Sequence, residues 1–254
     1  QIRAIQLTED DFVAVPASYD CESSEIEFLP ALKTLDLDVY LSPEEVKEKI
    51  FSLHTTLKDA HKNLSYTRNY CKFTTKIKQG RIPICFLDGN FTHFKLKSKN
   101  SQTPIIFPNY MTTELAEFLG YVFGDGYLHK NGVEICTENE EIVKRVKELS
   151  ISLFNIIPTI EKDLRTKSLC RVRIFSATLS YIINKLFNIN IGKKGKKLRV
   201  PEQIQKSRND VIIAFLRAYF DCEAYPKKTA RSIEVTSESK DMILDISLLL
   251  RRLG

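Results

Sequence analysis

The sequence predicts an α+β protein in which a unit of helices and strands occurs twice, preceded by a small helical unit. Two apolar helical runs, Leu115 to Gly126 and Ile212 to Ala224, each end in an acidic residue followed by Gly or Ala. Each run is followed by a short β-branched stretch and an amphipathic helical stretch, beginning at Val133 and Ile233. Since a repeat of about a hundred residues exceeds the periods of solenoid proteins, it indicates a duplicated domain.

Both runs carry a stripe of small residues at helical spacing. The stripes consist of Ala116, Gly120 and Gly124 in the first run and Ala214, Ala218 and Cys222 in the second. Helices with such stripes approach one another closely, because no branched side chain holds the backbones apart. We therefore expect the two helices to pack stripe to stripe, with their C-terminal ends together.

This packing would bring Asp125 and Glu223 side by side, since each follows the apolar part of its run. Two neighbouring carboxylates repel one another unless a divalent cation lies between them. Carboxylate oxygens are ligands that Mg²⁺ prefers. Asp125 and Glu223 are therefore the candidate metal ligands and catalytic residues, with Mg²⁺ as the expected cofactor.

At these residues the sequence resembles the LAGLIDADG family of homing endonucleases. Asp125-Gly126 and Glu223-Ala224 match the final acidic and small positions of the family motif, with Ala224 replacing its usual Gly. The resemblance implies a saddle of two αββαββα halves related by a pseudo-two-fold axis, the second half incomplete. It also implies a monomer that cuts double-stranded DNA at specific sites with Mg²⁺. We place the first half at residues 111–190 and a basic loop with the second half at residues 191–254.

Basic residues supply the candidate DNA contacts of the two halves. Arginine reads guanine edges, and both arginine and lysine neutralise phosphates. The expected contacts are Arg165, Lys167, Arg171 and Arg173 on a hairpin, and Lys193, Lys194 and Lys196 in the loop. The family resemblance also implies a lysine that assists catalysis. The candidates for that role are Lys196, Lys197, Lys227 and Lys228, and we assign it to Lys197 and Lys227.

The N-terminal part predicts two further units and a linker. Residues 1–20 resemble the β structure late in the first half of an intein splicing domain, so the chain resembles the endonuclease part of an intein; an ordinary hairpin is the alternative. Residues 21–94 predict a helical domain that resembles a helix-turn-helix, with Arg68, Lys72 and Lys76 facing DNA. A small helical bundle is the alternative there. Residues 95–110 predict a linker.

Composition is consistent with a nucleic-acid partner without requiring one, since the net charge is +6 over 254 residues. The six cysteines show no metal-binding spacing, and no apolar run has the length of a membrane span. We therefore expect no membrane partner and a cytoplasmic location.

Three other interpretations compete with an endonuclease. A non-catalytic DNA-binding protein on the same scaffold would lose the acidic ends of the motifs, yet Asp125 and Glu223 are both present. An RNA maturase would use the same saddle on intron RNA. A purely structural domain would place two acids at helix C-termini, where the helix dipole disfavours them.

Overall fold

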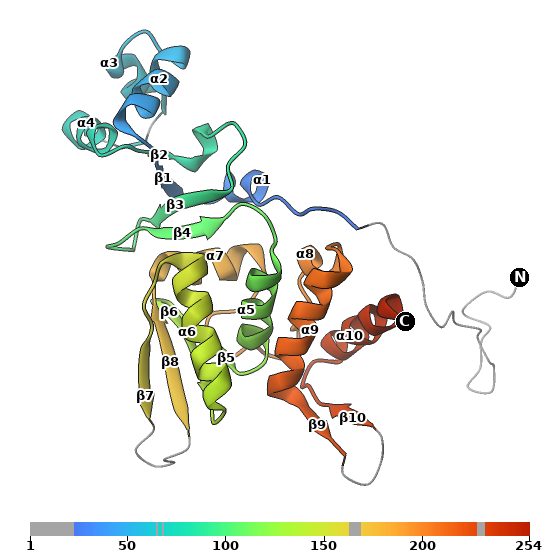
Figure 1. The fold of residues 1–254 in the computed structure, drawn as a ribbon. Helices are drawn as coiled ribbons and strands as arrows, with labels where there is room; N and C mark the ends of the chain where they lie inside the picture. Colours follow the sequence, from blue (N-terminus) through green and yellow to red (C-terminus); the bar gives the residue numbers. More distant parts are fainter. Residues whose placement is uncertain (1–22, 65, 68, 163–168, 228–231) are drawn as a thin grey trace, which may run out of the picture.

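The computed structural model describes residues 23–64, 66–67, 69–162, 169–227 and 232–254. The chain is an α+β protein with antiparallel sheets, as the sequence predicts. A narrow N-terminal part lies at one end of the molecule, and a broader part with the paired helices α5 and α9 forms the rest (Figure 1).

The broader part begins with one complete series of helices and strands. Its order is helix, two strands, helix, two strands and helix, the order that the family resemblance implies. The elements are α5 (Thr113–Phe123), β5 (Gly126–His129), β6 (Gly132–Thr137), α6 (Glu140–Phe154), β7 (Thr159–Lys162), β8 (Cys170–Phe175) and α7 (Ala177–Leu186). The strands form an antiparallel sheet in the order β5-β6-β8-β7.

A second, shorter series follows a loop and a short helix. Its elements are α8 (Glu202–Gln205), α9 (Asn209–Glu223), β9 (Ala224–Pro226), β10 (Ile233–Val235) and α10 (Lys240–Leu253). The order from α9 to α10 repeats the order from α5 to α6, and β9 pairs with β10 as β5 pairs with β6. The pseudo-two-fold relation of the two halves stays a prediction.

The N-terminal part differs from the purely helical domain expected at residues 21–94. It contains a sheet in the order β2-β1-β3-β4 together with four short helices. Its elements are α1 (Leu29–Leu32), β1 (Leu37–Tyr40), α2 (Pro43–Leu53), α3 (Leu57–Leu64), α4 (Tyr70–Lys78), β2 (Arg81–Pro83), the 3₁₀ turn η2 (Ile84–Phe86), β3 (His93–Ser98) and β4 (Ile105–Pro108). The segment 95–110, expected to be a linker, supplies most of β3 and all of β4, so that prediction is wrong.

The N-terminal sheet packs directly on the broader part of the molecule. The ring of Phe107 on β4 lies 6.1 Å from that of Phe154 on α6, and the backbone N–H of Ser98 donates to the hydroxyl of Thr178 on α7. Buried side chains from both parts belong to one continuous hydrophobic core. Residues 1–20, expected to be a remnant of a splicing domain, lie outside the described residues.

Candidate active site

Helices α5 and α9 make close backbone contact through the small residues that the sequence predicts. A Cβ placed on Gly120 would lie 2.5 Å from the carbonyl oxygen of Phe215 and 2.7 Å from the Cβ of Ala218. A Cβ on Gly124 would lie 2.5 Å from that of Cys222. Neither glycine therefore tolerates a side chain without movement of α9. The two helices lie side by side and end at the same end of the molecule (Figure 1).

Asp125 and Glu223 lie at these adjacent helix ends, and both are partly buried. Burial raises the pKa of Asp125, opposed by a hydrogen bond from the Cys222 thiol and by the charge of Lys194. Burial also raises the pKa of Glu223, and the negative charge of Asp125 raises it further. Burial and the charge of Asp125 raise the pKa of Cys222 to about 12, so its thiol keeps its proton. The two carboxylates therefore interact electrostatically, as the sequence predicts.

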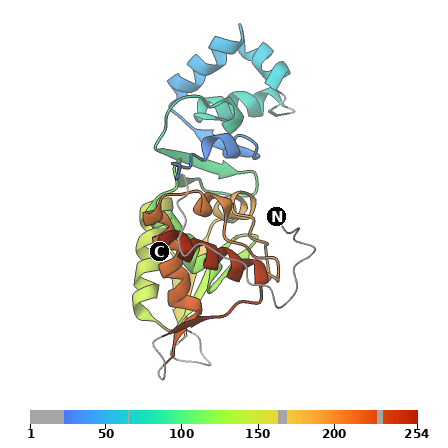
Figure 2. The same cartoon turned by 90° about the vertical axis from the view of Figure 1, so that its right-hand side faces the viewer.

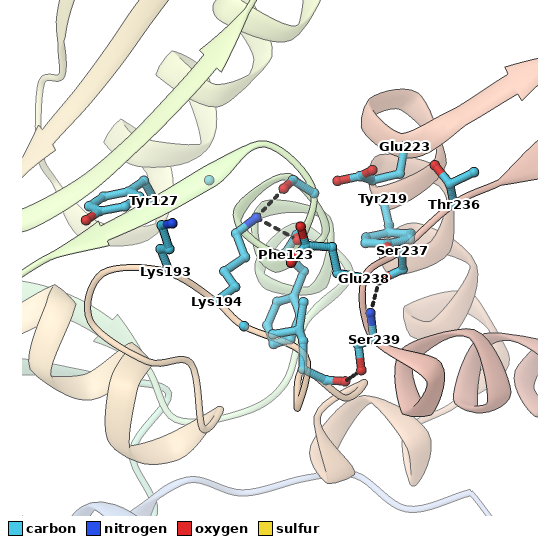
Figure 3. Close-up of a pocket in the computed structure, with 14 residues that line it drawn as sticks. Phe123, Tyr127, Lys193, Lys194, Tyr219, Glu223, Thr236, Ser237, Glu238 and Ser239 are labelled. Carbon is cyan, nitrogen blue, oxygen red and sulfur yellow. Dashed lines mark hydrogen bonds between the residues drawn. The ribbon is translucent and has the colours of Figure 1, made fainter.

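Lys194 closes the C-terminal end of α5. Its ammonium donates to the backbone carbonyl of Phe123 at 2.7 Å and to that of Gly124. The last carbonyls of a helix lack partners within the helix and favour a nearby cation. Burial lowers the pKa of Lys194 to about 8, although the charges of Glu223 and Asp125 oppose the change. Figure 3 shows Glu223 pointing toward this ammonium.

The loop that carries Lys194 is anchored on α10 and its N-terminal end. Arg199 forms an ion pair of 2.7 Å with the buried carboxylate of Asp245. The hydroxyl of Ser239 donates to the carbonyl of Leu198 at 2.6 Å and also caps α10. The second series of elements therefore positions a lysine at the end of the first.

These groups border an open cavity of about 620 Å³. Its polar lining comes from both series of elements and from the connecting loop (Figure 3), with Tyr127, Lys193, Lys194, Glu223, Ser237 and Glu238 around it. Tyr127 lies two residues after Asp125 on β5 and is exposed. An elongated anionic ligand would therefore reach the acids along β5 and the basic loop.

The acids fit a divalent cation that is shared with a ligand. Within the described residues, no group of three or more His, Cys, Asp or Glu side chains could hold a metal ion by itself. Mg²⁺ commonly binds through one or two carboxylates, with waters and substrate phosphates completing its coordination. Asp125 and Glu223 match this ligand set in number and chemistry.

The basic residues expected to assist or bind are distributed unevenly around this site. Lys193, Lys196 and Lys197 are exposed on the connecting loop, whereas Lys227 pairs with Glu234 at 2.6 Å. Arg171 and Arg173 both lie on β8 and are partly exposed. Arg165 and Lys167 lie outside the described residues, and so do Arg68 and Lys228.

Arg173 is already paired within the sheet. Its guanidinium donates to Glu134 at 2.7 Å and to Glu161 at 2.8 Å. Two carboxylates therefore fix its orientation on the sheet surface, which the charge pattern of the sequence does not show.

Helix α4 lies far from the two acids. Figures 1 and 2 place α2, α3 and α4 at the end of the molecule opposite the C-terminal ends of α5 and α9. Lys72 is exposed, whereas the Lys76 ammonium lies 3.3 Å from Asp38 and 3.9 Å from the centre of the Tyr66 ring. Lys76 is therefore already held by partners within the protein.

Sequence reasoning missed the roles of Cys222 and Tyr127 and assigned Lys194 to DNA contact alone. Two signals pointed to them. Tyr127 alternates with the buried Leu128 on a strand directly after Asp125, and Cys222 directly precedes Glu223. The capping contact of Lys194 joins positions about seventy residues apart, so no local pattern reveals it.

Comparison with known proteins gives three kinds of similarity. Residues 210–254, which include Glu223, match the family model described as a LAGLIDADG-like domain. The chain is 34% identical over 150 residues to the catalytic-type chain of an A-type ATP synthase from Pyrococcus abyssi, covering 59% of this chain and 14% of that protein. It is 40% identical over 146 residues to the replication factor C small subunit of Methanocaldococcus jannaschii, covering 56% of this chain and 7% of that protein.

A third curated relative and a solved structure extend these similarities. Glutamine–fructose-6-phosphate aminotransferase of Methanocaldococcus jannaschii is 28% identical over 238 residues, or 87% of this chain and 20% of that protein. The chain thus spans a fifth or less of the length of these three relatives. A crystal structure of I-DmoI in complex with DNA and Mn aligns with a TM-score of 0.40 and 19% identity, over 56% of this chain and 78% of that one.

No helix in the part of the chain that the structure describes is both long and apolar enough to cross a lipid bilayer. The cytoplasmic location expected from the sequence stays a prediction.

Proposed function

We propose that this chain is the endonuclease part of an intein and cuts double-stranded DNA at a specific site. One observation carries the proposal: Asp125 and Glu223 stand together at the ends of two helices in backbone contact, beside a cavity with basic groups. The match of residues 210–254 to a LAGLIDADG-like domain supports the same interpretation.

Asp125 and Glu223 would hold Mg²⁺ between the protein and the DNA phosphates. A divalent cation at this place supplies charge neutralisation on the phosphate and lowers the pKa of a bound water. Cys222 donates to Asp125 and orients its carboxylate. Lys194 adds a positive charge beside both acids without leaving its helix-capping position.

The remaining basic residues would bind the duplex on either side of these acids. We assign phosphate contacts to Lys193 and Lys196 and groove contacts to Arg171 and Arg173, with Arg165 and Lys167 on the same hairpin. Lys197 and Lys227 keep their proposed assisting roles at the two strands of the duplex. The protein would act as a monomer, since both acids belong to one chain.

The intein assignment rests on the diversity of the relatives. One chain is similar to parts of a replication factor, an aminotransferase, a reverse gyrase and an ATP synthase. The functions of these proteins have nothing in common that this segment would serve. A shared segment inserted into unrelated proteins explains the pattern directly. Sequencing the flanking gene tests this, because an intein is continuous in reading frame with a host protein on both sides.

Cleavage is tested by incubating a plasmid library of randomised sites with the protein and Mg²⁺. We expect linear products from the natural chain. Asp125→Asn and Glu223→Gln should each reduce cleavage about a thousandfold, because a loss of roughly 4 kcal/mol of charge stabilisation costs about tenfold per 1.4 kcal/mol. Asp221→Asn is the matched control, since Asp221 is exposed on the same helix and does not line the site cavity.

A non-catalytic DNA-binding protein is the second candidate, favoured by the replacement of the motif's final Gly by Ala224. Calorimetry with Ca²⁺ and a mixed-sequence duplex separates the two functions. An endonuclease loses the bound cation in Asp125→Asn and Glu223→Gln while keeping its DNA affinity. Equal Ca²⁺ binding by all three proteins would favour the non-catalytic function.

A further inference from the structure

The N-terminal sheet has one buried face and one polar face. Alternate residues along β3 are buried and exposed, with Phe94 and Leu96 buried and Lys95 exposed. On β1, Leu37 and Val39 are buried in the same way. This buried face packs on α6 and α7. The other face of the sheet is therefore fixed in position on the broader part of the molecule.

Cations and a tyrosine form a row across this polar face. Tyr40 on β1 lies opposite Arg81 on β2, and the register of β1 with β3 places Lys95 on its other side. The Arg81 guanidinium and the Lys95 ammonium each lie 5.5 Å from the centre of the Tyr40 ring. Two like charges on one small area of sheet are unfavourable unless an anion approaches.

The carboxylate within this face is already occupied. Asp38 accepts hydrogen bonds from the hydroxyl of Tyr66, from Lys76 and from Arg81. Among the ion pairs of the described residues, none involves Lys95 or Lys97. The charges of these two lysines are therefore available to an external anion.

The row of lysines continues to the sheet that borders the two acids. Lys99 follows the end of β3, and Lys130 lies in the turn between β5 and β6. Both line one cavity of about 630 Å³ between the N-terminal part and the broader part. Lys130 directly follows His129, whose ring centre lies 4.5 Å from that of Tyr127 in the candidate active site. A basic path thus runs from β3 to the acids' own sheet.

We propose that Lys95, Lys97, Lys99 and Lys130 form a phosphate-binding track for duplex DNA. The spacing fits, because alternate strand residues are about 6.6 Å apart and successive phosphates of one strand advance about 3.4 Å along the duplex. The track therefore meets every second phosphate. It gives the N-terminal part a DNA-binding role through its sheet, in place of helix α4. This inference rests on the proposed function for the identity of the ligand.

The test uses the Asp125→Asn protein, so that binding is measured without cleavage. The Lys95→Ala/Lys97→Ala pair is added to it, and anisotropy with a mixed-sequence duplex gives affinity over a range of salt concentrations. We expect the slope of log affinity against log salt to fall by about 1.8, since each phosphate contact contributes about 0.9. The control pair, Lys144→Ala/Lys147→Ala on α6, should leave the slope unchanged.

Duplex length locates the contact. A short duplex that covers only the two acids should bind both lysine pairs' variants equally, whereas a longer duplex should reveal the loss at Lys95 and Lys97. An unchanged slope on the longer duplex overturns the track, and an equal loss on the short one does so too. A loss seen with duplex RNA alone also overturns it. Thermal unfolding of each variant shows that its fold is intact.

Failure of the proposed function has a different signature. If the natural chain never cuts DNA while the slope still falls by about 1.8 with the longer duplex, the track stands and the nuclease assignment is wrong. If cleavage occurs and the slope is unchanged, the nuclease assignment stands and the track is wrong.

Discussion

At the scale of single residues, the candidate active site depends on a lysine that is not itself an acid or a metal ligand. The ammonium of Lys194 satisfies two carbonyls at the end of α5 and lies near both carboxylates. Without it, the helix end would present unpaired carbonyls beside two acids, and all of these groups are negative or partly negative. Lys194 therefore stabilises the arrangement before any cation or DNA binds.

Replacing Lys194 by Met tests this role, because Met keeps much of the chain length and removes the charge. We expect Lys194→Met to lower the free energy of unfolding by about 1–3 kcal/mol, the cost of leaving buried polar groups without a partner. Urea unfolding measures the change. Lys193→Met is the control, since its exposed neighbour should shift stability by less than about 0.5 kcal/mol. Equal effects of the two substitutions would show that the capping contacts of Lys194 add no stability.

At the scale of elements, the contact of α5 with α9 is a packing requirement that the sequence states openly. Two stripes of small residues at helical spacing predict close approach, and Gly120 and Gly124 meet Ala218 and Cys222 as expected. Such a contact is predictable from sequence because small residues at this spacing have few other uses in an apolar helix.

The same contact gives a sharp prediction for Gly120→Ala. Its new methyl group would lie 2.5 Å from the carbonyl oxygen of Phe215, so α9 must move away from α5. We expect a loss of about 1–3 kcal/mol in unfolding free energy, which is typical of overpacked cores. A weaker Ca²⁺ affinity in the presence of DNA should accompany it, because the two acids would separate. Lys147→Ala, on the exposed face of α6, serves as the control; a Gly120→Ala protein as stable as this control would contradict the close packing.

The N-terminal strands show why the rest of the fold was harder to predict. Strand β2 has only the residues Arg81–Pro83, and β1 pairs with β3 more than fifty residues away, so no local pattern joins them. β3 did carry a signal, since Phe94 and Leu96 alternate with His93, Lys95 and Lys97. Its lysines and the nearby prolines favoured a linker instead. The role of Lys76 depends on Asp38, whose place beside it is fixed only by the tertiary structure.

At the scale of the whole molecule, an aromatic cluster joins the N-terminal part to the rest. The ring of Phe107 on β4 lies 5.7 Å from that of Phe28 and 6.1 Å from that of Phe154 on α6. Phe28 in turn lies 5.7 Å from Phe187, directly after α7. The cluster is fully buried. A contact of this kind makes the two parts depend on one another for stability, although the sequence predicts separate units.

Phe107→Ala tests whether the two parts unfold together. Removing a buried phenylalanine costs about 3–5 kcal/mol, and we expect the whole loss to appear as a shift of one transition. Circular dichroism follows the helices, and tyrosine fluorescence follows a chain that has ten tyrosines and no tryptophan. Phe51→Ala is the matched control, because Phe51 on α2 is 50% exposed. Two separate transitions, with only the earlier one shifted by Phe107→Ala, would mean that the N-terminal part is an independent domain. A single shared transition would mean that the basic track on β3 is held rigidly against the catalytic sheet, as a continuous DNA path requires.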